Sequence, residues 1–214
     1  MKLKKINPGL QQSLEEAGLT DPTELQAETF SSIKSGADCV ISGPHEEGKT
    51  TAIVINVIQK LEKAQEQSPR ALVIVQDKAK VLELKELFDN LGGHTNLRIY
   101  GVYEQGDIDY DKNQISVGID VLIGTPGRLN DMFAGAGFDV NRLKMLIVDD
   151  TETLLRGRFE PKISRISNAI TKTQRLFFTD VITERVELLA DKLMVEPLFF
   201  EMEEGNEEDN EFED

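Results

Sequence analysis

The sequence predicts an α/β domain of three layers, in which a mostly parallel sheet lies between two layers of helices. Two observations carry this prediction. Short apolar runs alternate with amphipathic stretches of helical period through residues 39–200, which is the pattern of βαβ units. The apolar runs are also continuous, as in parallel strands that are buried on both faces. Ligands of such sheets bind at the carboxyl ends of the strands.

The expected elements follow one another along the chain. Strands are expected at Cys39–Ser42, Ala71–Val75, Leu97–Gly101, Val121–Ile123, Met145–Val148, Arg175–Phe178 and Leu198–Phe200. Helices are expected at Lys49–Ala64, Lys78–Leu91, Thr125–Phe133 and Ile182–Met194. Paired phenylalanines in the last strands, such as Phe199 and Phe200, are expected in the core.

Composition excludes several classes of protein. The chain has 214 residues, of which 39% are hydrophobic and 29% charged, as in globular domains. Its one cysteine, Cys39, leaves no internal disulfide and fits a reducing compartment. No apolar run reaches the ~18 residues of a membrane span, and the basic N-terminus lacks the apolar stretch of a secretory signal. We therefore expect a cytoplasmic protein without a membrane partner.

The net charge of −15 is concentrated at the C-terminus. Residues 201–214 carry nine carboxylates and no base, which leaves a net charge of −6 over residues 1–200. A run of like charges buries little surface, so we expect one domain over residues 1–200 and an acidic disordered tail over residues 201–214. The tail is either a solvated appendage or an acidic decoy for a basic groove.

A phosphate-binding loop is expected between the first strand and the helix after it. Residues 43–50 read GPHEEGKT, which fits the pattern G-x-x-x-x-G-K-T in its required context. Backbone N–H groups of such a loop converge on phosphate oxygens. Lys49 would neutralise the outer phosphates, and the Thr50 hydroxyl would bind Mg²⁺. The alternative, a glycine-rich turn with a chance lysine, does not account for both flanking elements.

Two carboxylates inside this loop oppose a bound triphosphate. Glu46 and Glu47 would repel phosphates unless their side chains turn toward water. Alternatively, Lys49 pairs with one of them and the chain occupies its own site. The loop therefore indicates the fold, whereas ATP binding depends on where these side chains lie.

An acidic segment ends the fifth expected strand. A carboxylate in this position, combined with a phosphate loop, is the second Mg²⁺ contact of nucleotide hydrolases. We expect Asp149 to bind the metal, and Asp150 to orient or deprotonate the attacking water. Lys49 would be the second catalytic group. A polar turn that caps a helix explains the segment equally well on its own, but not together with the phosphate loop.

Together these residues resemble the DEAD-box RNA helicases, specifically their N-terminal RecA-like domain of the P-loop NTPase class. The resemblance covers residues 1–200. Residues 18–26, GLTDPTELQ, are similar to the family's glutamine motif, which implies that Gln26 contacts adenine. The family's upstream aromatic residue is replaced by Met1. The resemblance implies a nucleotide site formed by Thr23, Gln26, Gly43, Glu46, Glu47, Gly48, Lys49 and Thr50.

An RNA contact is implied by the intact motif T-P-G-R at Thr125, Pro126, Gly127 and Arg128. In the family this motif holds RNA phosphates through the Thr, backbone amides at a helix start and the nearby Arg. The alternative is folding chemistry, because a Thr cap followed by Pro is also a common helix start.

Other motifs depart from the family's pattern. The D-E-A-D signature reads DDTE at 149–152, S-A-T reads TDV at 179–181, the glycine pair reads GV at 101–102, and P-T-R-E-L-A is unrecognisable at 76–81. The shorter Asp150 moves the catalytic carboxylate by roughly an ångström, which is enough to lose much of the rate. We also expect no second RecA-like domain, and thus none of the arginine fingers that contribute about 10³–10⁵ in rate.

Two functions remain open at this point. The first is a nucleotide-binding helicase domain that binds ATP, Mg²⁺ and weakly RNA, is at most a weak ATP hydrolase, and does not unwind RNA alone. The second is a catalytically degenerate module that regulates a protein partner, or a second helicase domain supplied in trans. His45, His94 and Cys39 lack the spacing of metal ligands, so neither function involves a structural metal.

Overall fold

The computed structural model describes residues 3–44, 48–65 and 67–202. Its strands are β1 (Cys39–Ser42), β2 (Ala71–Ile74), β3 (Ile99–Val102), β4 (Val121–Gly124), β5 (Met145–Val148), β6 (Gln174–Thr179) and β7 (Leu198–Glu201). Its helices are α1 (Pro8–Glu16), α2 (Glu24–Ser35), α3 (Lys49–Leu61), α4 (Lys78–Leu91), α5 (Ile108–Ser116), α6 (Pro126–Ala134), α7 (Thr151–Arg156), α8 (Glu160–Asn168) and α9 (Glu184–Leu193).

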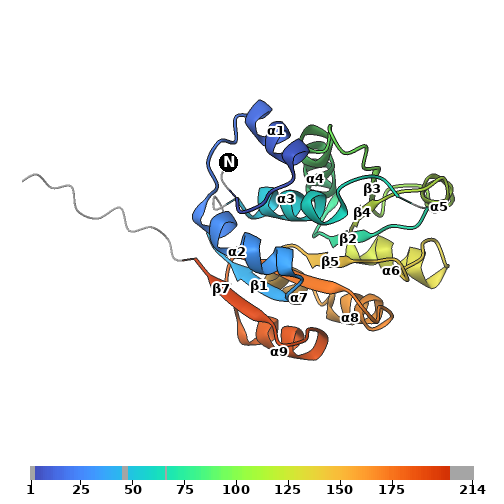
Figure 1. Ribbon diagram of the computed structural model, residues 1–214. Coiled ribbons are helices and arrows are strands. Elements are labelled where there is room, and N and C mark those ends of the chain that lie inside the picture. The colour runs from blue at the N-terminus through green and yellow to red at the C-terminus, as the bar shows by residue number, and fades with distance from the viewer. Residues whose placement is uncertain (1–2, 45–47, 66, 203–214) are drawn as a thin grey trace, which may run out of the picture.

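Within these residues, seven strands form one sheet in the order β3-β4-β2-β5-β6-β1-β7, and each pairing is parallel. Helices α1 to α4 pack on one face, where side chains such as Cys39 and Ile41 point. Helices α5 to α9 cover the opposite face, toward which Val40 points. The three layers (Figure 1) confirm the predicted architecture.

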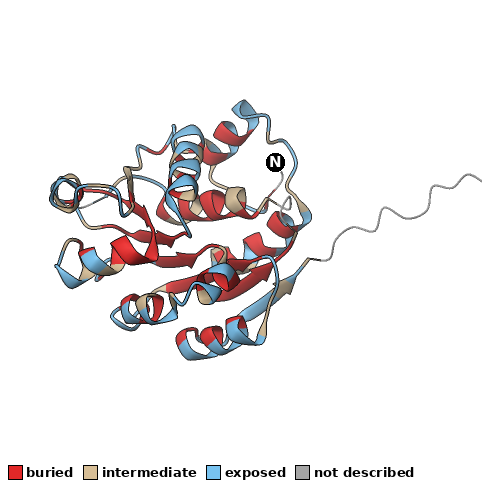
Figure 2. Ribbon diagram, turned by 180° about the vertical axis from the view of Figure 1, so that it is seen from behind, coloured by how far each residue is buried: buried red, intermediate tan, exposed pale blue. Residues whose placement is uncertain are grey.

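The core lies on both faces of the sheet, as the predicted continuous apolar strands require. Strands β1, β2, β4 and β5 are buried at each position, and the buried stripes of the helices turn toward them (Figure 2). The edge strand β7 is different because within the described residues it pairs only with β1. The prediction that Phe199 lies in the core is therefore wrong, and its side chain is 43% exposed.

The sequence patterns placed most strands within one or two residues but missed several helices. Helix α1 begins where the Asn7 side chain accepts the Gly9 N–H at 2.9 Å, with Pro8 in its first turn. The helix α3 ends at Leu61, three residues before the expected end, because Glu62 has a φ of 61°. Local turns of this kind carry no long apolar period, so a pattern of buried positions does not reveal them.

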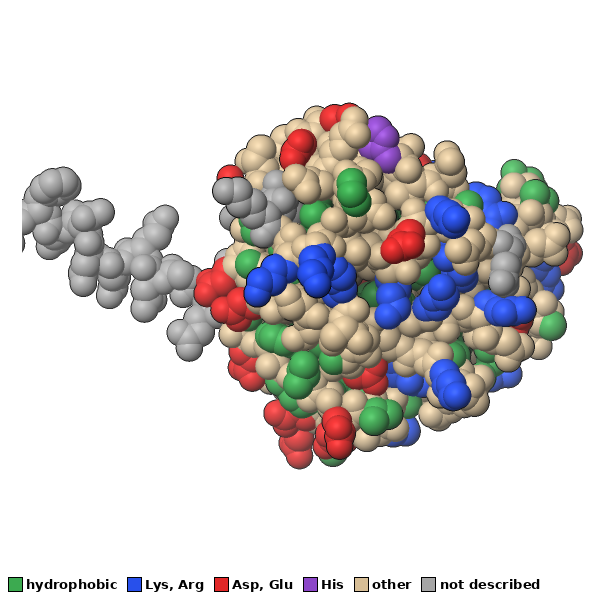
Figure 3. All heavy atoms as spheres, viewed as in Figure 1, with side chains coloured by type: hydrophobic (Ala, Val, Ile, Leu, Met, Phe, Trp, Pro, Cys, Tyr) green, Lys and Arg blue, Asp and Glu red, His purple; other side chains and the backbone are tan. Residues whose placement is uncertain are grey.

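Strand β7 extends one residue past residue 200, where the acidic tail is expected to begin. Glu201 is the last residue of β7, and the Met202 N–H donates to the Ser42 carbonyl at 3.0 Å. Residues 203–214 lie outside the described part of the chain. On the face seen in Figure 3, Lys and Arg side chains spread across the middle, while acidic side chains gather over β7 and α9.

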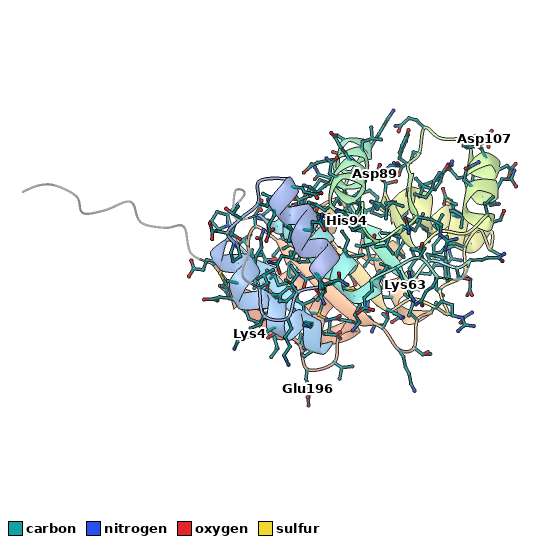
Figure 4. The ribbon with its side chains drawn as sticks, turned by 45° about the horizontal axis from the view of Figure 1, so that its top comes forward. Lys4, Lys63, Asp89, His94, Asp107 and Glu196 are labelled. Carbon is teal, nitrogen blue, oxygen red and sulfur yellow. The ribbon has the colours of Figure 1, made fainter. Side chains whose placement is uncertain are left out.

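Two further expectations concern single residues. Cys39 is buried in β1, and burial raises the pKa of its thiol to about 12, which makes it unreactive. His94 lies beside α1 (Figure 4), with its Nε2 3.2 Å from Glu16 Oε2 at the surface. None of the helices in the described ranges is long and apolar enough to cross a membrane.

A buried ion cluster joins β2, β3 and β4 at their amino ends. Asp120 is fully buried, with Arg70 Nη2 2.7 Å from its Oδ1 and Arg98 Nε 2.8 Å from its Oδ2. Burial opposes ionisation of this carboxyl, but hydrogen bonds from Arg98, Gln65 and Arg70 hold its pKa below the usual range. The cluster therefore stabilises the fold only while Asp120 keeps its charge.

Asp120→Asn is expected to lower the free energy of unfolding by about 3–5 kcal/mol, because it leaves the buried Arg70 guanidinium and the partly exposed Arg98 guanidinium without a countercharge. Urea unfolding at pH 7 measures this change. Asp191→Asn, at an exposed position on α9, is the control and should change stability by less than ~0.5 kcal/mol. Equal stability of the two variants would contradict the assigned role of the cluster.

Candidate functional site

The predicted catalytic and metal-binding residues meet at the carboxyl edge of the sheet. Pairing of β2 with β5 aligns Ile74 with Val148, so the residues that follow these two strands lie side by side. A cavity of about 320 Å³ opens there. Its lining consists of Lys49, Thr50, Gln76, Asp77, Ala79, Lys80, Glu83, Asp149 and Asp150. Residues about a hundred positions apart in the sequence, such as Lys49 and Asp149, thus line one cavity.

Lys49 begins α3 at the predicted phosphate loop and is buried. Its ammonium group donates to the carbonyls of Gly43 and Pro44, and lies 2.6 Å from Asp180 Oδ1. Asp180 is exposed, with 58% of its side chain accessible to solvent. The positive charge expected to meet a phosphate is therefore already paired with a carboxylate of the chain.

His45, Glu46 and Glu47 lie outside the described residues. Their predicted influence on a bound triphosphate stays a prediction. Among the described residues, the carboxylate that pairs with Lys49 is Asp180, which follows β6 and lies outside the loop.

The glutamine motif contacts the phosphate loop directly. Gln26 is buried and its Nε2 donates to the Gly48 carbonyl at 3.2 Å. Its Oε1 accepts the Thr23 N–H, and the Thr23 hydroxyl accepts the Gln26 N–H, which makes a capping box at the start of α2. Gly48 has a φ of 73°, and a Cβ there would lie 2.6 Å from Gln26 Nε2. The loop therefore needs glycine for both its backbone and its neighbour.

Asp149 and Asp150 follow β5, as predicted. Asp149 is buried, and its Oδ2 has no hydrogen-bond partner among the described residues. Burial, and then the charge of Asp150, raise the pKa of Asp149 to about 7. Asp150 precedes α7 with a φ of 48° and ψ of 47°, a left-handed conformation that Asp tolerates better than most residues.

An ammonium group lies where the sequence predicts Mg²⁺. Lys80 Nζ donates to Thr50 Oγ1 at 2.8 Å and lies 3.9 Å from Asp149 Oδ2. The Asp149 oxygen, which lacks a hydrogen bond, would suit a metal, but a divalent ion beside it would meet the positive charge of Lys80 at close range. Among the described residues, no group of three or more His, Cys, Asp or Glu side chains could hold a metal. The residues present, in this arrangement, do not fit Mg²⁺.

The acidic segment after β5 is connected by hydrogen bonds to the TDV segment, which begins at the last residue of β6. The Glu152 N–H donates to Thr179 Oγ1 at 3.4 Å, and the Thr183 hydroxyl donates to Glu152 Oε2 at 2.5 Å. Thr151 donates to the Phe178 carbonyl at 3.0 Å. These bonds join the end of β6 to the acidic segment. The pairing of β6 with β1, which aligns Thr179 with Ser42, brings Asp180 to the same edge as Lys49.

The predicted RNA contact lies at the start of α6, after β4. Thr125 precedes the helix, but its hydroxyl makes no capping bond and instead donates to Glu104 Oε2 at 2.8 Å. Arg128 is buried in an ion pair with Asp111, with Nη2 and Nε 2.6 and 3.0 Å from Oδ2. Asp107 begins the neighbouring helix α5, whose first N–H groups it accepts (Figure 4). Carboxylates of the chain thus lie against both groups that were expected to hold RNA phosphates.

Comparison with known proteins now identifies the family. Residues 23–189 match the model of the DEAD/DEAH box helicase family. The chain belongs to this family.

Relatives agree over nearly all of the chain. It is 25% identical over 195 residues to "ATP-dependent RNA helicase DeaD" of Mycobacterium tuberculosis, which covers 90% of this chain and 34% of that protein. It is 29% identical over 199 residues to "ATP-dependent rRNA helicase RRP3" of Candida albicans, covering 91% and 37%. "ATP-dependent RNA helicase eIF4A" of Eremothecium gossypii is 24% identical over 199 residues, covering 92% and 49%. The chain therefore spans about a third to a half of the relatives' length.

Four charged residues at this DEAD-box site were not predicted from the sequence. Lys80, Glu104 and Asp111 lie outside the motifs that matched the family, and Asp180 was noticed only as part of an altered S-A-T motif. Lys80 stands at the Leu of P-T-R-E-L-A, and Asp180 stands at the Ala of S-A-T. A charged residue in place of an apolar or small one is a sign in the sequence that could have singled out both. Glu104 and Asp111 carried no such signal.

Asp149→Asn is expected to stabilise the protein increasingly as the pH rises. In the unfolded chain Asp149 loses its proton near pH ~4, but in the fold only near its raised pKa of about 7. Stability is therefore lost as the pH rises between these values, and Asn removes the loss. Urea unfolding of both proteins at pH 5, 6.5 and 8 measures it. A pH-independent difference would contradict the raised pKa; Asp191→Asn is the control.

Proposed function

We propose that this chain is the nucleotide-binding N-terminal domain of a DEAD-box RNA helicase, which binds ATP and RNA weakly and does not unwind RNA by itself. The observation that supports this most is the shared cavity of Lys49, Thr50 and Asp149 at the carboxyl edge. The hydrogen bond from Gln26 to Gly48 holds the Gln26 side chain beside the loop, where it would contact adenine.

Binding a triphosphate requires Lys49 to exchange its partner. The Lys49 ammonium and the N–H groups at the start of α3 would bind phosphate oxygens, and Asp180 would turn into solvent. This exchange is open to the chain because Asp180 is more than half exposed. The exchange also weakens binding, because the free energy gained from the Lys49–phosphate contact is reduced by the loss of the Lys49–Asp180 ion pair.

Hydrolysis is expected to be slow at most. Asp150 would have to orient the attacking water, but its backbone is held in the left-handed region at the start of α7 and its side chain is a methylene shorter than Glu. The Arg128 guanidinium is paired with Asp111 and supplies no charge to the nucleotide cavity. We therefore propose that efficient turnover needs groups from a protein partner or a second helicase domain.

RNA would bind at the start of α6. The Thr125 hydroxyl and the first N–H groups of the helix would hold a phosphate once Glu104 moves away. Glu104 is exposed, so its displacement breaks one hydrogen bond and no packing. Arg128 would support this site by fixing α6 against α5 through Asp111 more than by contacting RNA itself.

A regulatory module is the second candidate function. It is favoured by one specific observation: three carboxylates of the chain already bind the groups that a phosphate would need. These groups are Lys49, Thr125 and Arg128, which contact Asp180, Glu104 and Asp111 in turn. On this reading the chain keeps the fold and a closed site, and acts on a protein partner.

Isothermal titration with ATP distinguishes these functions. We expect weak binding by the wild type, none by Lys49→Ala, and binding about tenfold tighter by Asp180→Ala, a gain of ~1.4 kcal/mol, because Lys49 no longer needs to leave a carboxylate. Asp191→Ala is the matched control and should bind as the wild type does. Absence of heat and of any melting shift for both wild type and Asp180→Ala at millimolar ATP would favour the regulatory module.

Glu104→Gln is expected to raise the affinity for single-stranded RNA several-fold and to steepen its salt dependence by about one phosphate contact. The amide keeps the hydrogen bond from Thr125 but removes the negative charge at the helix start. Fluorescence anisotropy with a labelled oligonucleotide measures this, with Glu187→Gln on α9 as the exposed control. Unchanged affinity would place RNA binding elsewhere.

A further inference from the structure

We propose that Lys80 is the resident cation of the nucleotide site, and that this chain binds the phosphates of a nucleotide without a divalent metal. The proposal rests on the proposed nucleotide-binding function and specifies which group neutralises the phosphates there. Lys80 is neither part of a motif that matches the family nor a residue that the sequence patterns selected.

The geometry places the Lys80 ammonium between the two predicted metal ligands. It donates to Thr50 Oγ1 at 2.8 Å, lies 3.9 Å from Asp149 Oδ2, and lies 3.2 Å from Glu83 Oε1. The ammonium group thus donates hydrogen bonds to Thr50 and Glu83 and forms an ion pair with Asp149. Only 16% of the side chain is exposed, so Lys80 is held inside the cavity and does not extend into solvent.

Backbone hydrogen bonds fix the position of Lys80 relative to Asp149. Lys80 lies in the first turn of α4, where its N–H donates to the Asp77 side chain at 2.9 Å. Helix α4 follows β2, and the Asp149 N–H donates to the Ile74 carbonyl of β2 at 2.9 Å. The start of α4 and the end of β5 are therefore locked side by side, which brings the Lys80 side chain to Asp149.

A lysine and a divalent ion exclude each other at this point. Mg²⁺ binds oxygen at about 2.0–2.1 Å, so an ion on Thr50 and Asp149 would lie within a few ångströms of the Lys80 nitrogen. Charge repulsion at that distance opposes the binding of a divalent ion. The ammonium supplies one positive charge next to Asp149 and Asp150 instead.

The same ammonium can reach a bound nucleotide. Lys80 and Lys49 line one cavity of about 320 Å³, so phosphate oxygens between them would accept from both. The Thr50 hydroxyl would then remain the acceptor of the Lys80 hydrogen bond and would not become a metal ligand. This gives the chain two fixed positive charges for the phosphates, independent of the concentration of divalent ions.

A titration with a fluorescent ATP analogue, in EDTA and in Mg²⁺, tests the proposal. The wild type should bind equally in both buffers. Lys80→Leu should bind about tenfold more weakly in EDTA and regain affinity in Mg²⁺, because the metal then has room. Lys78→Leu removes a lysine from the same turn, where it lies over the Tyr103 ring at 4.7 Å, and should behave as the wild type does. Loss of wild-type binding in EDTA would overturn the proposal.

A measurement without nucleotide separates this proposal from the proposed function. Addition of Mg²⁺ alone should raise the melting temperature of Lys80→Leu and leave that of the wild type unchanged. Lys80→Met serves as a second variant if the first does not fold. If neither the wild type nor the variants bind the nucleotide in either buffer, the proposed function fails. The melting temperatures in Mg²⁺ still decide whether Lys80 takes the place of the metal. A Mg²⁺ shift in the variant alone supports Lys80 as the resident cation, whereas an equal shift in the wild type, or none in the variants, overturns it.

Discussion

The parallel pairing of β2, β5, β6 and β1 is the constraint on which the site depends. Parallel strands end at one edge, and the hydrogen bonds of β5 to β2 and to β6 set which residues meet there. Lys49 after β1, Lys80 after β2, Asp149 after β5 and Asp180 after β6 are brought together in this way. Lys49, Lys80 and Asp149 line one cavity, and Asp180 lies beside it at the surface. Buried charges are stable only when they are paired, and these groups pair with one another.

This internal pairing distinguishes the chain from an open phosphate site. Asp180 neutralises Lys49, Lys80 neutralises the acidic end of β5, and Glu104 lies against the donor group before α6. Each position that a ligand would fill therefore holds a group of the protein with the ligand's own charge: carboxylates for phosphates and an ammonium for the metal. A ligand binds by exchange, so its affinity depends on how easily exposed groups such as Asp180 and Glu104 move.

The sequence predicted the fold, because continuous apolar runs alternate with helical stretches, and it placed the motif residues after the strands of that fold. Continuous runs such as 121–123 and 145–148 determine a parallel sheet, and residues after parallel strands must lie at one edge. The pairing of Lys80 with Thr50 could not be predicted, since it depends on the angle at which α4 leaves β2 and on the reach of one side chain. The contact of Glu104 could not be predicted either, because the loop before α5 has no sequence pattern. Residues of the phosphate loop at 45–47 lie outside the described residues.

The most direct test of the account is a crystal structure of the chain with a non-hydrolysable ATP analogue, grown in the presence of Mg²⁺. The account predicts the triphosphate on Lys49 and the start of α3, with Asp180 turned away and Lys80 still bonded to Thr50 in place of a metal. A Mg²⁺ ion between Thr50 and Asp149, with Lys80 displaced, would contradict it.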